Sequence, residues 1–442
     1  ADNKTDAAFN KSLETAKLVF NFMTSKFSPF TQMADGTLKQ INPFSGTEVW
    51  TVPGRAHRPF DEVAPESKAS SCAFCWDRKL ETPPEKARML SDATILGNVP
   101  VPQLDATDPD FRRIPNLFEI VSFDYWHANY GLDADYALID AYLNDDSGYQ
   151  HVQQVVVAKT KQRLEGKELA FAARGFFSGG HDVIVARSHT KSSGEMSKEE
   201  HARFISFTAD SMRDLYERHP HANYVVAFQN WLKPAGASFD HLHKQLVAID
   251  DRGRALRNLE ALVLENPNIF QDKGLDVARR HNLIIEENEH AVLFAGFGHR
   301  YPTLEVYSKH PGRPWEHSEE QIRGLSDVLH TAHVAIGSNV ACNEEWHHQP
   351  ADVSCAMPWR INLKLRVSTL AGFEGGTHIY INTISPWDLR DKILAALDNH
   401  RELLAVDFGE LKARSVHDVI NARDVFVGDF ARELAFVKLV EV

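Results

Sequence analysis

The sequence predicts an α+β protein made of two tandem units related by internal duplication. From residue 116 onward, short β-prone runs alternate with amphipathic helical patterns. A strand ending in His189 precedes Ser197 by eight residues, and a strand ending in His310 precedes Ser318 by the same eight. Each serine opens a helix, so the chain repeats one strand–helix–strand unit. We expect an antiparallel sheet with packed helices.

The elements follow in order from their local patterns. The first 30 or so residues carry an apolar stripe that predicts a helix. Ser197 with Glu200, and Ser318 with Gln321, have capping-box spacing. Ser385–Pro386 predicts the start of a C-terminal helix. The predicted strands are 181–189, 223–230, 239–250, 303–310 and 359–368, and the predicted helices of the two units are 197–219 and 318–336.

These patterns predict three segments. They are an N-terminal helical extension (1–38), a first unit (39–250) that carries the candidate chemistry, and a second unit (251–442). The join falls near the turn-prone residues 250–255.

Bulk composition excludes several classes of function. The formal net charge of −13 argues against a nucleic-acid or anionic-membrane partner, which would favour a basic surface. No apolar run reaches the roughly 18–20 residues that span a bilayer, and the N-terminus lacks the layout of a secretory signal. We therefore expect a cytoplasmic protein. Four cysteines in 442 residues are too few for a disulfide framework.

The stretch "FDHLHKQLVAID" holds the strongest catalytic signal. His241, His243 and Gln245 alternate along a predicted strand, so their side chains share one face. A neutral imidazole can attack phosphorus directly when an acceptor holds its other ring nitrogen. A glutamine can donate to a phosphoryl oxygen and is a poor base for activating water. The pattern therefore favours transfer to an acceptor over hydrolysis.

Two further groups of residues fit phosphate and metal chemistry. Arg55 and Arg58 could bind phosphate oxygens, although two ordinary surface arginines would look the same. Ser238, in a glycine-containing turn, could also reach a phosphate. "SCAFC" presents Cys72 and Cys75 either as a metal half-site or as incidental thiols. The candidate partners that would complete a closed, structural zinc site are His189 and His241.

Five motifs in order resemble the galactose-1-phosphate uridylyltransferase branch of the histidine-triad superfamily. They are "INPFSGTEVWTVPGRAHRPF", "CAFC", "IPNLFEIV", "HTKSS" and "FQNWLKPAGASFDHLHKQ", spread over roughly residues 40–250. The resemblance implies two tandem half-barrel domains and a ping-pong nucleotidyltransferase that moves a nucleotidyl group between a nucleotide-sugar and a sugar 1-phosphate. Two alternatives stay open: a phosphorylase that uses inorganic phosphate as acceptor, and a zinc-braced nucleotide-binding protein without turnover.

The resemblance also implies roles for single residues. His243 would be the nucleophile and Gln245 would bind the transferred phosphoryl group. Arg55, Arg58, Asn230 and Ser238 would contact phosphates, Asn116 would contact the nucleoside, and Cys72, Cys75, His189 and His241 would bind zinc. A homodimer is implied as well.

The sequence departs from the family pattern at several positions. Leu242 replaces the proline between the two histidines, and Lys244 replaces a small residue. In the second unit, the predicted alignment puts Asn362 and Lys364 where the histidine pair would stand. His347 matches one remaining ligand of a second metal site, which we expect to be absent.

Overall fold

The computed structural model describes residues 28–52, 72–189, 191–367 and 370–407. Within them an eleven-stranded antiparallel sheet runs in the order β10-β11-β12-β14-β13-β8-β9-β7-β6-β4-β5. Its strands are β4 (Ala87–Leu90), β5 (Ile95–Gly97), β6 (Pro109–Pro115), β7 (His181–Ala186), β8 (Tyr224–Trp231), β9 (His243–Ile249), β10 (Ile284–Glu287), β11 (Ala291–Ala295), β12 (Thr303–Ser308), β13 (Cys342–His347) and β14 (Arg360–Leu365).

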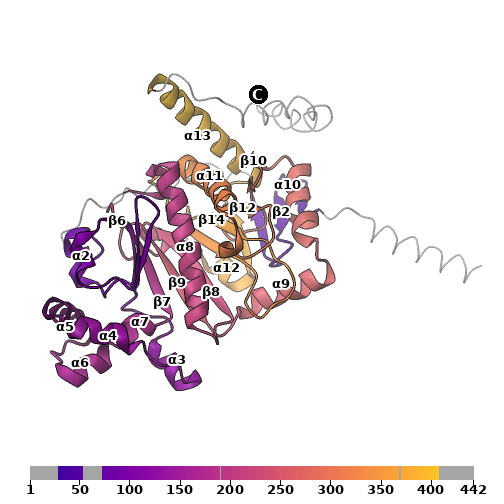
Figure 1. The fold of residues 1–442 in the computed structure, drawn as a ribbon. Coiled ribbons are helices and arrows are strands. Elements are labelled where there is room, and N and C mark those ends of the chain that lie inside the picture. The colour runs from indigo at the N-terminus through magenta and orange to yellow at the C-terminus, as the bar shows by residue number, and fades with distance from the viewer. Residues whose placement is uncertain (1–27, 53–71, 190, 368–369, 408–442) are drawn as a thin grey trace, which may run out of the picture.

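The strand order confirms the predicted duplication. It is symmetric about the junction of β8 and β13, which pair directly, so the two units share one continuous sheet. The helices α8 (Lys198–Arg218) and α11 (Glu319–Ile336) lie together across one face of this sheet (Figure 1). Ser318 and Gln321 form a full capping box, while Ser197 accepts from the backbone of Glu200. The opposite face carries His243 and Gln245.

A helical insertion distinguishes the first unit from the second. Residues 116–180 join β6 to β7, whereas only residues 296–302 join the corresponding strands β11 and β12. The insertion has its own buried cluster, which includes Ile139, Val155 and Leu169, and forms a lobe at one end of the sheet (Figure 1). Its helices are α3 (Phe123–Tyr130), α4 (Tyr136–Leu143), α5 (Asp146–Thr160), α6 (Gly166–Ala173) and α7 (Gly175–Ser178).

A second, four-stranded sheet ties the two ends of the described chain together. The order is β1 (Phe30–Gln32), β2 (Leu38–Ile41), β3 (Glu48–Thr51) and β15 (Ile379–Asn382), with β15 parallel to β3. Residues 30–32 are therefore a strand where the sequence predicted the end of a helix; residues 1–27 lie outside the described part. The helix α13 (Pro386–Asp407) begins where predicted, and Ser385 accepts from the backbone of Asp388.

The remaining elements are short or lie at the edges. They are η1 (Trp76–Glu81), α2 (Gln103–Ala106), η2 (Ser193–Glu195), η3 (Lys233–Ala235), α9 (Gly253–Glu265), η4 (Gln271–Leu275), α10 (Asp276–Arg280), η5 (Pro314–Glu316) and α12 (Gly372–Thr377). The predicted join at residue 250 falls in the loop between β9 and α9. Among the described helices, none has the length and apolar character needed to cross a bilayer.

The strand register allows the two units to be compared. Val247 lies opposite His181, the first residue of β7, and Lys364 lies opposite Thr303, the first residue of β12. These first residues precede the helix caps by 16 (197 − 181) and 15 (318 − 303) positions, so β7 and β12 correspond. With the first residues of β7 and β12 superposed, Lys364 falls at Val247, Asn362 at Gln245 and Arg360 at His243. With the two helix caps superposed, each falls one residue earlier, so the residue-by-residue match of the two units stays a prediction.

Candidate active site

Two cysteines and two histidines from separate segments meet beside the first-unit strands. The ligand atoms of Cys72, Cys75, His189 and His241 all lie within 4.8 Å of one another. Cys75 Sγ is 3.3 Å from His189 Nδ1, and Cys72 Sγ is 3.6 Å from His241 Nδ1. A tetrahedral zinc ion places sulfur and nitrogen ligands about 3.6 Å apart, given its usual bond lengths. The group that the sequence predicted is therefore arranged as a metal site.

The chemistry of the four side chains also fits a metal ion. Both cysteines are buried, and neither forms a disulfide within the described part of the chain. His241 Nε2 donates to the carbonyl of Ala186 at 2.6 Å, which leaves Nδ1 unprotonated and directed at the sulfurs. Burial lowers the pKa of His241 to about 4, so its ring is neutral, as a ligand must be. The cluster links the loop before η1 to the start of β9.

His243 begins β9 and has the geometry of a nucleophile. Its Nδ1 donates to the carbonyl of His241 at 2.7 Å, so Nε2 keeps its lone pair. The side chain is 5% exposed, and burial lowers the pKa of the ring, which favours the neutral form. The ring of Phe74, which lies between the two cysteines, is 5.1 Å from the imidazole, centroid to centroid. Sequence reasoning missed Phe74.

Gln245 is held by a residue that the sequence did not single out. The backbone N–H of Ile120 donates to His181 Nδ1 at 3.0 Å, so His181 Nε2 carries the proton. His181 Nε2 donates to Gln245 Oε1 at 3.1 Å. Asn116 Nδ2 also lies 3.1 Å from His181 Nε2. The amide group of Gln245 is thus oriented with its NH₂ available to an acceptor. A signal existed: His181 opens the strand that leads to His189.

The other predicted phosphate contacts are only partly placed. Phe228 on β8 lies opposite Gln245, and Asn230 follows two residues later on the same face. Asn230 Oδ1 accepts from Asn343 Nδ2 at 2.8 Å, a contact across the seam between the two units. Ser238 is exposed in the loop before β9, close in sequence to His243 but with no contact that fixes its role. Arg55 and Arg58 lie outside the described residues.

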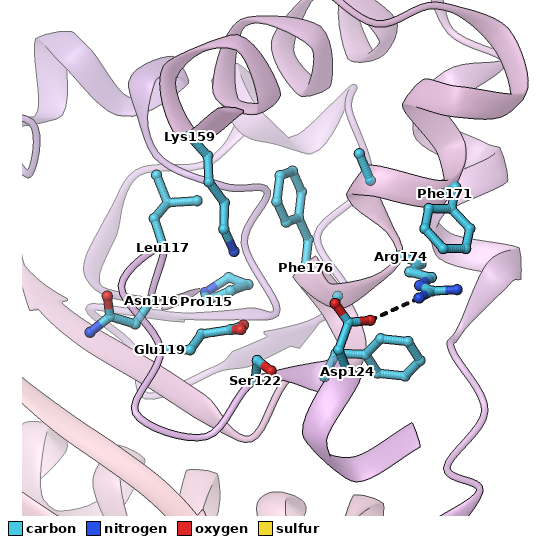
Figure 2. Close-up of a pocket in the computed structure, with 13 residues that line it drawn as sticks. Pro115, Asn116, Leu117, Glu119, Ser122, Asp124, Lys159, Phe171, Arg174 and Phe176 are labelled. Atoms are coloured by element: carbon cyan, nitrogen blue, oxygen red, sulfur yellow. Dashed lines mark hydrogen bonds and ion pairs between the residues drawn. The ribbon is translucent and has the colours of Figure 1, made fainter. Parts of the chain in front are cut away.

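The segment after Asn116 forms the boundary between this site and the inserted lobe. Figure 2 shows Lys159 of α5 and Glu119 directed into one cavity of about 120 Å³, while the Asn116 side chain points away from it. At its rim Arg174 donates to Asp124 at 2.8 Å. Burial raises the pKa of Glu119 to about 7. A neighbouring apolar cavity of about 360 Å³ shares Lys159 and extends to Ala73, Leu117 and Phe118.

A buried charge network supports β9 from the helix-covered face. Lys244 lies between His243 and Gln245 but points to the opposite face, where it pairs with Glu344 of β13. Both side chains are 0% exposed. Glu344 also accepts from Trp346 Nε1 at 2.6 Å and from His333 of α11 at 2.8 Å. Lys244, which departs from the family pattern, therefore fastens the candidate catalytic strand to the second unit.

Comparison with known proteins places this arrangement in a family. A family model described as a domain of unknown function, DUF4921, matches residues 33–429. The chain belongs to this family. The matched residues include both units and the inserted lobe that only the first unit carries.

Named relatives of this DUF4921 chain are more distant. ADP-glucose phosphorylase of Arabidopsis thaliana is 23% identical over 365 residues, which cover 78% of this chain and 89% of the relative. Its crystal structure with bound ADP-glucose gives a TM-score of 0.57 at 21% identity, covering 81% of this chain and 98% of that one. A GalT-like protein of the same plant gives 0.55 at 20%, covering 80% and 98%. A uridylyltransferase structure gives 0.50 at 16%, covering 82% and 98%.

These likenesses confirm the predicted fold class. The α+β architecture, an antiparallel sheet with packed helices, is shared with the ADP-glucose phosphorylase structure and the GalT-like structure. The curated relative is a phosphorylase, whereas the resemblance drawn from the sequence pointed first to uridylyl transfer.

Proposed function

We propose that this protein is a nucleotidyltransferase that works through a nucleotidyl-histidine on His243. The observation that carries the proposal is the hydrogen bond from His243 Nδ1 to the carbonyl of His241, which frees Nε2 for attack. The neutral ring, kept so by burial, supplies the lone pair. Gln245, oriented by His181, offers its NH₂ group to a phosphoryl oxygen.

The reaction has two balanced steps. In the first, Nε2 of His243 attacks the α-phosphorus of a nucleoside-diphosphate sugar, the bond from that phosphorus to the bridging oxygen breaks, and sugar 1-phosphate leaves. In the second, an oxygen of a phosphate-bearing acceptor attacks the same phosphorus and the P–N bond breaks. Nε2 recovers its lone pair, and the nucleotidyl group leaves on the acceptor. Gln245 binds the phosphoryl oxygens in both steps without activating water.

We propose inorganic phosphate as the acceptor and an ADP-sugar as the donor. The support is the curated relative named ADP-glucose phosphorylase, whose structure contains ADP-glucose. Phosphorolysis would give ADP and the sugar 1-phosphate. Transfer to a sugar 1-phosphate, our first expectation from the sequence, is the second candidate, favoured by the likeness to a uridylyltransferase structure.

An acceptor assay separates these candidates. ADP-glucose and UDP-glucose are each incubated with inorganic phosphate or with galactose 1-phosphate, and the nucleotide products are resolved by ion-exchange chromatography. We expect ADP to form from ADP-glucose only when phosphate is added. Product formation that requires galactose 1-phosphate instead would favour the transferase. Absence of product from every pair would support the binding protein without turnover.

We propose that Cys72, Cys75, His189 and His241 hold a structural zinc ion. All four positions of a tetrahedral site are filled by protein, so the ion would brace the start of β9 and leave no open position for substrate. Its contribution would be to fix the loop that carries Phe74 against His243.

Loss of one thiolate tests this role. Cys75→Ser is expected to reduce bound zinc from one ion per chain to well below one, measured by elemental mass spectrometry. The free energy of unfolding should fall by several kcal/mol, because metal binding is coupled to folding. Cys355→Ser, at a half-buried free thiol in the second unit, is the matched control and should change neither quantity. Full zinc content in Cys75→Ser would contradict the assignment.

A further inference from the structure

A row of three polar side chains crosses the seam between the two units. The register of β8 and β9, continued one residue past Gln229, places Asn230 opposite His243. Asn230 in turn lies opposite Asn343 of β13. Side chains that are directly opposite on neighbouring strands stand about 5 Å apart on the same face of a sheet. The second unit therefore contributes a side chain two strands away from the candidate nucleophile.

Two hydrogen-bond partners fix the orientation of the Asn343 amide. Arg366 Nη1, which can only donate, lies 3.0 Å from Asn343 Oδ1. The backbone carbonyl of Ala235, which can only accept, lies 2.8 Å from Asn343 Nδ2. Exchanging the oxygen and the nitrogen of this amide would turn both hydrogen bonds into repulsive contacts. The Asn343 side chain is therefore held in one orientation.

The orientation of Asn343 determines that of Asn230. Asn343 Nδ2 also donates to Asn230 Oδ1 at 2.8 Å, so the oxygen end of the Asn230 amide is engaged across the seam. The donor end, Asn230 Nδ2, is thereby left available to an acceptor on a bound molecule. It lies beside the turn at Gly236, where an added Cβ would be 3.9 Å away. Gln245, held by His181, presents its amide nitrogen in the same way.

Asn343 also holds the loop that leads into β9. Ala235 is the last residue of η3, and from there the chain runs through Ser238 to His243. One amide nitrogen of the second unit thus contacts both Asn230 and the start of this loop. Asn230 and Asn343 both line a cavity of about 300 Å³ over the seam, so the pair borders open space as well as packed side chains.

We propose that Asn343 is a positioning residue for the reaction at His243. Held by Arg366, it keeps Asn230 Nδ2 directed at a nonbridging oxygen of the phosphoryl group on His243. A donor that is fixed in advance stabilises the charge developing on this oxygen without reorganising during the reaction. The inference rests on the proposed function, and it gives the second unit a part in chemistry that the first unit carries out.

Asn343→Asp tests the orientation with a side chain of almost unchanged shape. A carboxylate has no N–H, so Asn230 must rotate its amide to donate to it, and Oδ1 of Asn230 then faces the phosphoryl group. We expect kcat for phosphorolysis of ADP-glucose to fall about tenfold or more, with KM changed less than about threefold, because the lost interaction belongs to the transition state. Asn258→Asp, the same change at an exposed residue of α9, is the matched control and should leave kcat unchanged.

A double-mutant cycle separates positioning from two other causes. In the Asn230→Ala background, Asn343→Asp should have no further effect on kcat, because the amide through which it acts is gone. Direct repulsion of phosphate by the new carboxylate, or loosening of the loop after η3, would still lower kcat in that background. An additive loss in the double variant, or a kcat of Asn343→Asp equal to that of the wild type, would overturn the proposal.

A second variant keeps the test informative if Asn343→Asp does not fold. Asn343→Ala removes the contact without adding charge, so the Asn230 amide becomes free to rotate. We expect a smaller fall in kcat, which should also disappear in the Asn230→Ala background. Failure of the proposed function would look different: the wild type itself would give no ADP from ADP-glucose and no labelled histidine, which would overturn this inference as well.

Discussion

Replacing His243 by alanine is expected to lower turnover by on the order of 10⁵-fold, the scale seen when a covalent nucleophile is removed. The folded structure should persist, because the imidazole makes one hydrogen bond, to the carbonyl of His241, and is not a ligand of the Cys₂His₂ cluster. The measurement is steady-state phosphorolysis of ADP-glucose, with the thermal midpoint and zinc content recorded on the same preparation.

The covalent intermediate gives a direct readout of the same prediction. ADP-glucose labelled at the α-phosphate, incubated without acceptor and then denatured in alkali, should leave one label per chain that is stable to base and released by acid. His243→Ala should carry none. His221→Ala, at an exposed histidine after α8, is the control and should label like the wild type. Label retained by His243→Ala would place the nucleophile elsewhere.

Neutralising Glu344 is expected to be the most destabilising single change, with Glu344→Gln costing about 3–5 kcal/mol of unfolding free energy. Burial alone would raise the pKa of Glu344, but Lys244 and His333 hold it well below its ordinary range. The substitution would therefore leave the ammonium of Lys244 buried and uncompensated at 0% exposure. Urea unfolding followed by tryptophan fluorescence measures the change.

Two companion variants make the argument specific. Glu345→Gln, one residue along β13, removes a carboxylate that is about one-third exposed and pairs with Lys364; it should cost under about 1 kcal/mol. Lys244→Met combined with Glu344→Leu should recover most of the lost stability, because apolar pairs of similar volume often replace buried ion pairs without penalty. Equal costs for Glu344→Gln and Glu345→Gln would show that burial of the pair is not what matters.

Local pattern was enough to predict much of the site. The alternation of His243 and Gln245 placed both side chains on one face of a strand, and the order of the cysteines and histidines led to the metal group. The helix caps at Ser197, Ser318 and Ser385 could also be predicted, because each serine accepts from a backbone N–H only three residues later. Such features depend on spacing along the chain, which the sequence states directly.

Features that depend on the register between distant strands could not be predicted from the sequence. The match of Lys364 to a histidine stays a prediction, because strand spacing alone does not show which cross-strand partners are opposite. His181 was missed for the same reason: its role comes from the backbone of Ile120 and from Gln245, two segments far from it in sequence. The buried pair of Lys244 and Glu344, 100 residues apart, likewise appears only once β8 and β13 are joined.

The direct pairing of β8 with β13 has a consequence for how the two units could diverge. If the sheet were assembled from two identical chains, any change at the position of His243 would appear twice, and the partner position could not differ. Because one chain supplies both, a mutation reaches one position at a time. The first unit alone can carry His243, and a 65-residue lobe (116–180) can be attached to one side alone. Because both units belong to one chain, they can carry different residues even though their strands are arranged symmetrically.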